Sequence, residues 1–273
     1  MKAVIVCHLE NDLRNNFGEA KKIPLEKQTF EHVPKLLNWI GTLKIPITVS
    51  VMAGGQVGNR LLLALKEKNV KIPNNINLGI HFHAENFTNS KWQYEKPLEL
   101  PAYENYYNQF VQSLSIKPKT VVFGKWKVDR QAYPLFAKLG ITHDASNILP
   151  RGIINPPANI NGLITVPGLS YNGQPVNPLT RLSDFLLTKK IISRYHNKNL
   201  LLHLAFHSYD FFSPQNPTHW RGIKKIIFTD ILSQLKKHNV EIVNLENVNS
   251  GKNETLEKMP VPLLGRLFQL IGH

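Results

Sequence analysis

Short β-rich runs alternate with segments of helical spacing along almost the whole chain. The β-rich runs lie at residues 3–8, 46–52, 77–83, 120–123, 141–143, 163–166, 200–206 and 240–243. The apolar spacing between them predicts helices, the clearest at residues 104–115, 130–139, 182–195 and 220–237. Strands and helices that alternate in this way form a parallel sheet covered by helices. Because no linker, repeat or Gly-rich phosphate motif interrupts the pattern, it predicts an α/β fold with a barrel-like sheet of about seven parallel strands in one domain, residues 1–273.

Charge and apolar content limit the partners and the setting of the chain. Lysine and arginine outnumber aspartate and glutamate 33 to 19, and the formal net charge of +14 favours anionic partners. The basic residues are scattered and no nucleic-acid-binding motif is present, so we expect no nucleic acid partner. The apolar run at residues 3–9 is short and contains His8, which is typical of a first strand rather than a signal sequence. No apolar stretch reaches the roughly 20 residues that span a bilayer, so the sequence predicts a cytoplasmic protein without a transmembrane segment.

Three other segments carry specific expectations. Cys7, the single cysteine, lies in the first apolar run and is expected to be a buried core residue. Residues 147–181 are rich in Asn, Pro and Gly and predict a long loop region of the kind that often shapes a site. Residues 259–273 are apolar with one arginine and predict a C-terminal helical segment that packs on the domain or contacts a second copy in a homodimer. A membrane-surface helix is less favoured there, because a short segment without a basic face anchors weakly.

Two of the predicted strands end in histidine. Residues 79–83 read Gly-Ile-His-Phe-His, and residues 202–207 read Leu-His-Leu-Ala-Phe-His. Residues two apart in a strand share a face, so His81 and His83 point the same way. Imidazole is a common metal ligand and a general acid or base near pH 7. Functional residues of parallel α/β folds collect at the carboxyl ends of strands, so the pattern predicts an active site there.

Carboxylates follow the first strand, where Glu10 and Asp12 lie two residues apart. At the same sheet edge they could meet the histidines, with Glu10 the expected ligand and Asp12 its competitor. Two imidazole nitrogens and one carboxylate leave an open coordination position, as in catalytic zinc or related divalent sites. A metal of this kind lowers the pKa of bound water to about 7. His207 would then protonate the leaving group, while His203, deeper in its strand, is expected to be structural.

Several blocks of the sequence resemble polysaccharide deacetylases of the NodB-homology type, particularly divergent members associated with surface-polysaccharide synthesis. Residues 78–81 (Leu-Gly-Ile-His) are similar to the metal-histidine motif of the family. The most specific block joins residues 124–126 (Gly-Lys-Trp) to residues 135–146, which end Leu-Gly-Ile-Thr-His-Asp-Ala-Ser. Residues 163–167 are similar to the apolar run and proline that follow. Residues 201–208 end in His-Ser, similar to the late-strand motif that carries the catalytic acid.

The resemblance implies a distorted (β/α) barrel that hydrolyses N-acetyl groups on sugars with a divalent metal, expected to be zinc. It also implies a set of site residues. They are the metal ligands Glu10, His81 and His83, the catalytic residues His8 and His207, and the substrate-binding residues Lys125, Trp126 and Asp144. Asp144 is weighed for a second task, the ordering of a loop beside the site.

The chain also departs from the family at several positions. The family's first acidic motif supplies a catalytic base, and His8 stands at its position, which makes His8 the expected base and Glu10 the remaining acidic ligand. The second metal histidine has either His83 or Glu85 as its counterpart. Val122 stands where the family has an arginine that orients the base. These departures fit either an active site with a histidine base or a site without turnover.

We therefore expect a carbohydrate N-deacetylase. The cytoplasmic setting and positive charge favour a nucleotide- or lipid-linked sugar intermediate of surface polysaccharide synthesis as the substrate. The first alternative is a catalytically silent relative that binds a glycan or a partner protein. The second is a hydrolase of the same fold that acts on a non-sugar amide or ester. A nucleic-acid binder is the third, and steep salt dependence of its affinity would identify it.

Overall fold

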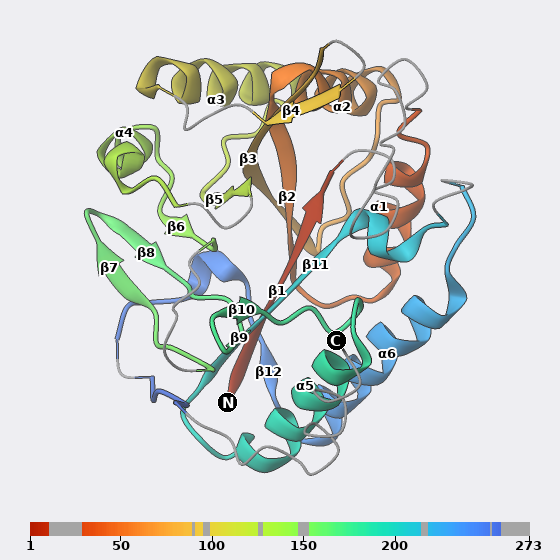
Figure 1. The fold of residues 1–273 in the computed structure, drawn as a ribbon, viewed down its shortest axis with the longest axis vertical. Helices are drawn as coiled ribbons and strands as arrows, with labels where there is room; N and C mark the ends of the chain where they lie inside the picture. The colour runs from red at the N-terminus through yellow and green to blue at the C-terminus, as the bar shows by residue number, and fades with distance from the viewer. Residues whose placement is uncertain are drawn as a thin grey trace.

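The described part of the chain folds into a curled, mostly parallel sheet with helices on its outside (Figure 1). The computed structural model describes residues 1–10, 29–88, 91–94, 99–124, 128–146, 153–213, 218–251 and 253–257, with the backbone alone for 84–88 and 91–94. The strands are β1 (Lys2–Leu9), β2 (Ile47–Gly54), β3 (Ile76–Thr88), β4 (Lys91–Tyr94), β5 (Thr120–Phe123), β6 (His143–Asp144), β7 (Ala158–Ile160), β8 (Leu163–Thr165), β9 (Ser170–Tyr171), β10 (Gln174–Pro175), β11 (Leu201–His207) and β12 (Glu241–Ile242). The α-helices are α1 (His32–Thr42), α2 (Gly55–Glu67), α3 (Leu100–Leu114), α4 (Tyr133–Lys138), α5 (Leu182–Tyr195) and α6 (Gly222–Lys237). Short 3-10 helices are η3 (Arg130–Ala132), η4 (Ser208–Phe211) and η5 (Leu245–Asn247).

The main sheet has the strand order β11-β1-β2-β3-β5-β6-β8-β7. All neighbours from β11 to β8 are parallel, which gives the seven parallel strands expected from the sequence. The antiparallel β7 borders β8, β4 pairs with the end of β3, and β12 adds a short parallel pairing to β1. The fold is therefore an α/β half-barrel of the distorted (β/α) type, as predicted.

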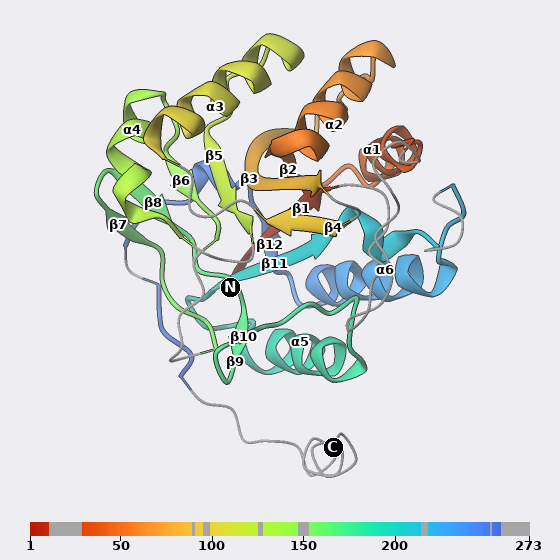
Figure 2. The same cartoon turned by 45° about the horizontal axis from the view of Figure 1, so that its top comes forward.

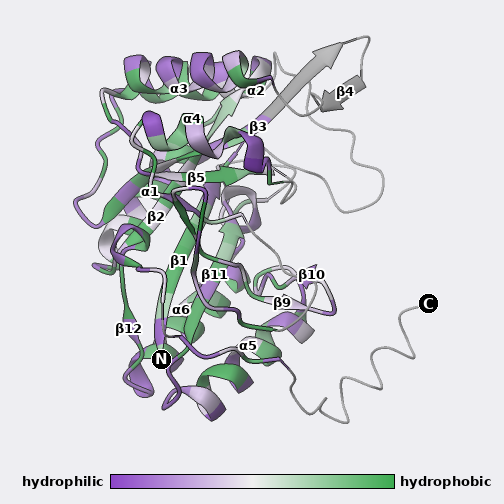
Figure 3. Cartoon of the chain, turned by 90° about the vertical axis from the view of Figure 1, so that its left-hand side faces the viewer, coloured by the Kyte–Doolittle hydropathy of each residue, from purple (hydrophilic) through white to green (hydrophobic). Residues whose placement is uncertain are grey.

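Both faces of the sheet are apolar, and different groups of residues cover them. On one face, Ile5, Cys7 and Leu9 of β1 pack with the buried sides of α1 and α2. On the other face, Val4 and Val6 line the inside of the curl. Because residues alternate between faces along a strand, His8 shares the inner face with these two valines. Figure 2 shows the helices arranged around the curled sheet, and Figure 3 shows the apolar strands that they cover.

The two ends of the curled sheet contact each other at His203. Nδ1 of His203 in β11 lies 3.1 Å from the carbonyl oxygen of Val166, just after β8. The backbone N–H of Leu169 donates to the carbonyl oxygen of His203 at 3.3 Å. The chain after β8 thus reaches β11 without forming a strand pair with it. His203 is buried on the inner face, in the structural position expected for it.

Most predicted elements are confirmed, and the differences lie in the loop-rich part. The helix at 182–195 has the predicted bounds, whereas the predicted helix at 104–115 begins earlier, at Leu100. The region 147–181, predicted as loop with one strand, holds the β7–β8 hairpin and the two-stranded β9–β10 ribbon in its described part. The predicted C-terminal segment at 259–273 lies outside the described residues. None of the described helices has the length and apolar content needed to cross a membrane.

Candidate active site

Five polar side chains gather at the carboxyl ends of three parallel strands. His8 is the second-last residue of β1 and Glu10 follows that strand, His81 and His83 come from β3, and His207 ends β11. Four of these side chains are fully buried, and only that of His207 is partly exposed, at 22%. The predicted convergence of the two histidine-bearing strand ends with the carboxylate after β1 is therefore present in the structure.

The strand register explains why these residues meet. Ser50 in β2 pairs with His8, and Met52 pairs with His81. Glu10 lies two residues after His8, and Met52 lies two residues after Ser50, so continuing the register places Glu10 beside Met52. Because Met52 pairs with His81, Glu10 and His81 lie at the same level of the sheet. Oε1 of Glu10 accordingly lies 3.1 Å from Nε2 of His81.

Glu10 occupies the centre of the cluster. Besides His81, its Oε1 lies 3.8 Å from Nδ1 of His83 and 3.6 Å from Nε2 of His207. Its backbone N–H donates to Oγ of Ser208 at 3.1 Å, which fixes the chain just after β1. A buried carboxylate is costly unless positive charge or donors compensate it. One carboxylate oxygen that faces three imidazole nitrogens marks a position suited to a cation.

The hydrogen bond on the far side of the His81 ring fixes its tautomer. Nδ1 of His81 lies 3.2 Å from the carbonyl oxygen of Val122, and a carbonyl can only accept, so Nδ1 carries the proton. Burial lowers the pKa of His81 against the opposing pull of Glu10, which favours the neutral ring. Nε2 then presents a lone pair to the Glu10 carboxylate, and two such electron-rich atoms need a cation between them. A histidine anchored by a backbone carbonyl through its other nitrogen is the usual arrangement at metal sites.

His8 completes a compact group of ligand atoms. His8, Glu10 and His81 each offer one ligand atom, and these atoms all lie within 4.8 Å of one another. The His8 ring stacks on His81 at 4.9 Å and meets His207 edge-on at 4.8 Å. Burial, followed by the charges of His207 and His81, lowers the pKa of His8 well below its usual value. A neutral nitrogen and carboxylate donor set fits a divalent ion such as zinc. The structure thus brings His8, expected to be the base, as close to Glu10 and His81 as a ligand would lie.

His207 stands at the accessible side of the cluster with a carboxylate behind it. Its Nδ1 lies 3.8 Å from Oδ2 of Asp210, and its backbone N–H donates to the same oxygen at 2.9 Å. A carboxylate behind an imidazole orients the ring and stabilises its charged form. The sequence reasoning missed Asp210, although an aspartate three residues after a strand-ending histidine is a usable signal.

Asn177 connects this side of the site to the start of α5. Its side-chain N–H donates to Oδ2 of Asp210 at 3.0 Å, and its backbone N–H donates to Oδ2 of Asp184 in the first turn of α5 at 3.0 Å. Asn177 lies in the region 147–181, which was expected to border the site. The side-chain network therefore holds part of that region against η4 and α5.

Asp144 points away from the histidine cluster. It pairs with Val121, which packs in the outer core between sheet and helices. Its carboxylate accepts hydrogen bonds from the Tyr133 hydroxyl and from the Ser146 hydroxyl and backbone N–H, the last at 2.8 Å. Burial is the main cause that raises its pKa. These contacts match the loop-ordering task weighed for Asp144, and its contact with a substrate stays a prediction.

Several predicted site residues lie outside the described part of the chain. Lys125 and Trp126, predicted to bind substrate, and Asp12, the competitor of Glu10, are among them. Glu85, the alternative to His83, belongs to β3, but its side chain is not described. Val122 stands where the family's arginine would stand, and its backbone oxygen rather than its side chain takes part in the site.

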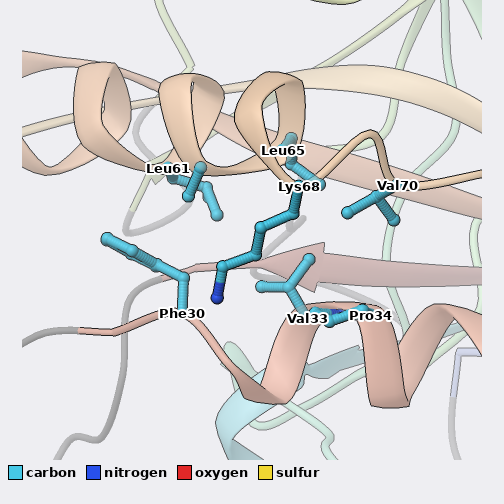
Figure 4. A pocket seen from close by; sticks show the side chains of 8 residues that line it. Phe30, Val33, Pro34, Leu61, Leu65, Lys68 and Val70 are labelled. Atoms are coloured by element: carbon cyan, nitrogen blue, oxygen red, sulfur yellow. The ribbon is translucent and has the colours of Figure 1, made fainter.

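A small apolar pocket lies away from the histidines, between α1 and α2 (Figure 4). Core residues such as Phe30, Val33 and Leu61 line it. The Lys68 side chain crosses it and donates to the carbonyl oxygen of Thr29 at 3.1 Å. The space does not admit a water molecule, so this pocket is a packing gap rather than a substrate site.

Comparison with solved structures identifies the architecture. No protein-family model and no curated protein matches the sequence. A protein from Mycobacterium smegmatis that is named as a polysaccharide deacetylase superposes with a TM-score of 0.50 and 13% identity, over 85% of this chain and 81% of its own. A GH57-type branching enzyme from Pyrococcus horikoshii gives 0.50 and 9%, over 94% and 72%. The GH57 branching enzyme from Thermococcus kodakaraensis gives 0.50 and 10%, over 94% and 73%.

These relationships are of fold alone, and the fold serves more than one reaction on carbohydrates. A fold does not decide function, so the site must do so. The strand order and the superposition on the deacetylase from Mycobacterium smegmatis indicate the same fold. The chain therefore has the NodB-like fold of the polysaccharide deacetylases.

Proposed function

We propose that the protein is a metal-dependent hydrolase that removes an N-acetyl group from a sugar. The observation that carries the proposal is the buried Glu10 carboxylate, which a carbonyl-anchored, neutral His81 faces through its lone pair. His8, Glu10 and His81 would hold the ion. When bound, a divalent ion supplies a polarised acetamide carbonyl and a water molecule acidic enough to attack near neutral pH.

The remaining histidines are available for proton transfer. His83 lies 3.8 Å from Glu10 and would accept the proton of the attacking water, while His207 would donate a proton to the leaving amine. The partial exposure of His207 suits a group that meets the substrate, and Asp210 lies behind its ring, 3.8 Å from Nδ1. In this assignment His8 and His83 exchange the roles of base and ligand that the family resemblance implies.

The donor set favours this chemistry over glycoside hydrolysis. Glycosidases use two carboxyl groups that flank the scissile bond, about 5 to 9.5 Å apart. Among the described residues of the cluster, Glu10 is the carboxylate surrounded by histidines, and Asp210 lies behind the His207 ring, where it supports that ring. An imidazole-rich site with one central carboxylate suits metal-assisted amide hydrolysis better than double displacement at a sugar carbon.

The substrate class remains part of the proposal. An acetamido sugar in a nucleotide- or lipid-linked intermediate of surface polysaccharide synthesis agrees with the formal net charge of +14 and with a cytoplasmic setting. A silent glycan binder of the same fold is the alternative to be tested against it.

Metal content and acetate release test the proposal together. The full-length protein, stripped with a chelator and reloaded with zinc, should hold about one ion per chain and release acetate from N-acetylated sugar oligomers. Glu10→Gln and His81→Ala should lower metal content and reduce kcat/KM by roughly a hundredfold or more. His238→Ala, at a half-buried histidine that follows α6 at the opposite end of the strands from the site, is the matched control and should change neither.

Two outcomes would count against a metal-dependent deacetylase. Absence of zinc binding at saturating zinc would remove the metal mechanism. Tight zinc binding with sugar affinity but no acetate release would establish the silent binder.

A further inference from the structure

Exposed apolar side chains concentrate on two neighbouring helices. Among the described residues, six large apolar side chains are strongly exposed, and four of them lie in the first halves of α5 and α6. They are Leu182 (62%), Leu186 (48%), Ile223 (60%) and Ile226 (65%). Single exposed apolar residues are ordinary, but a contiguous group marks an interaction surface.

An ion pair shows that the four side chains form one surface. Lys189 of α5 and Asp230 of α6 pair at 2.8 Å, so these two positions face each other. Both helices run in the same direction, because α5 leads into β11 and α6 leads from β11 to β12, and both strands are parallel to β1. Figure 2 shows the two helices side by side.

Helix geometry extends this alignment toward the N-terminal ends. Leu186 lies three residues before Lys189 and Ile226 lies four residues before Asp230, which corresponds to about 4.5 and 6 Å along the axes. Leu182 and Ile223 each lie seven residues before the paired positions, about 10.5 Å along. Two apolar pairs therefore follow the ion pair toward the helix starts. We call these four side chains the α5–α6 apolar face.

The α5–α6 apolar face lies on the side of the active site. The helix α6 begins shortly after η4, and the backbone N–H of Arg221 donates to the carbonyl oxygen of Phe211 in η4 at 2.7 Å. Asn177 bridges Asp210 of η4 and Asp184 in the first turn of α5. Both helix starts are thus tied to the 3-10 turn that follows His207.

Two arginines lie beside this face, one at the start of each helix. Arg181 precedes Leu182 at the start of α5 and is exposed, and the half-buried Arg221 precedes Gly222 at the start of α6. The acidic neighbours are engaged within the protein, since Asp230 pairs with Lys189 and Asp184 accepts from Asn177. Apolar side chains flanked by arginines are the composition of a surface that binds anionic lipid headgroups.

We propose that the α5–α6 apolar face docks on an anionic lipid surface. Leucine and isoleucine side chains enter the boundary between headgroups and acyl chains, and the flanking basic residues contact lipid phosphates. The active-site side of the barrel then lies toward the bilayer. This docking goes beyond the proposed deacetylation and does not depend on it.

Vesicle flotation with the full-length protein tests the docking. The protein should float with vesicles of equal parts phosphatidylglycerol and phosphatidylcholine and not with phosphatidylcholine alone. The variant Ile223→Gln/Ile226→Gln should weaken binding roughly tenfold or more, and adding Leu182→Gln/Leu186→Gln should abolish it. Arg181→Gln/Arg221→Gln should weaken binding and make it less sensitive to salt.

The remaining exposed leucines of α2 and α3 supply the matched control. Leu63 (51%) and Leu100 (46%) are about as exposed as Leu186 (48%), and Leu63→Gln/Leu100→Gln should bind like the wild type. Thermal unfolding of every variant checks the fold, and release of acetate from a soluble acetamido sugar should be unchanged.

Three results would overturn the proposal. The first is a wild-type protein that does not float with anionic vesicles. The second is binding that survives the four substitutions but disappears in full-length Leu267→Asp/Phe268→Asp, which would assign it to the C-terminal segment. The third is self-association that the four substitutions abolish without any vesicle binding, which would make the face a dimer contact.

Discussion

At the scale of single residues, a backbone carbonyl sets the chemistry of His81. The Val122 carbonyl holds the proton on Nδ1, which turns the Nε2 lone pair toward the Glu10 carboxylate. The family resemblance implies an arginine where this chain has Val122, and this chain contacts His81 there through main-chain atoms. The orientation of the His81 nitrogen that faces Glu10 therefore does not depend on the side chain at position 122.

The roles of His8 and His83 can be separated by metal affinity. If His8 is a ligand, as its proximity to Glu10 and His81 indicates, His8→Gln should lose zinc, because an amide is a poor substitute for imidazole. His83→Gln should keep zinc and lose roughly a hundredfold or more in kcat. Chelator competition measures the affinity and acetate release measures kcat. Zinc loss in His83→Gln with retention in His8→Gln would restore the assignment implied by the family resemblance.

The sequence could predict part of this cluster because strand alternation is a local rule. It places His81 and His83 on one face without knowledge of any partner strand. The contact of His8 with His81 depends on register between distant strands. A single sequence carries no local signal for such register.

At the scale of elements, β3 needs glycine at position 79. A Cβ there would lie 2.2 Å from Oγ1 of Thr120 and 2.9 Å from Oγ of Ser50. Ser50 is the register partner of Gly79 in β2, so the two side chains already fill the inner face below the histidines. The glycine of the Leu-Gly-Ile-His motif thus lets β2, β3 and β5 close tightly beneath the site.

Gly79→Ala should therefore destabilise the fold. Overpacking of this kind costs about 1–3 kcal/mol of the free energy of unfolding, measured by urea denaturation. Thr120→Ala in the same chain should recover part of the loss, because it removes the closer oxygen. Gly222→Ala is the control, since no atom lies within 4 Å of its added Cβ, and its stability should be unchanged or slightly higher. Equal stability of Gly79→Ala and wild type would refute the packing argument.

The long elements were predictable from their periodicity and the short ones were not. The helices α5 and α6 follow from apolar spacing over four turns, and β1 and β11 follow from strongly apolar runs. The strands β7, β9 and β10 have two or three residues each, too few to show a periodicity among Asn, Pro and Gly. Their pairing follows from two-residue turns, Asn161-Gly162 and Asn172-Gly173, which have positive φ at both positions and are a local signal that periodicity does not use.

At the scale of the whole molecule, His203 joins the first and last parts of the parallel sheet. Its ring contacts the chain after β8, and its own backbone belongs to β11. Burial lowers the pKa of His203 from 6.5 to about 4. The folded protein thus binds this proton less readily than the unfolded chain does.

Stability should consequently fall as pH falls from about 6.5 to about 4. Over that window the unfolded chain takes up the proton and the folded protein does not, and the pKa difference corresponds to about 3 kcal/mol of the free energy of unfolding. His203→Asn keeps a donor near Nδ1 and removes the titration. Its stability should depend less steeply on pH in this window, as measured by urea denaturation at several pH values. A slope equal to that of the wild type would show that other groups carry the dependence.

Cys7 lies on the outer face of β1, packed between sheet and helices with no exposed surface, and burial raises the pKa of its thiol. It is the chain's single cysteine. The folded protein should therefore not react with thiol reagents. A cysteine introduced at Ile226 would be the one reactive thiol, so a fluorophore or spin label can be attached there without first removing a native residue.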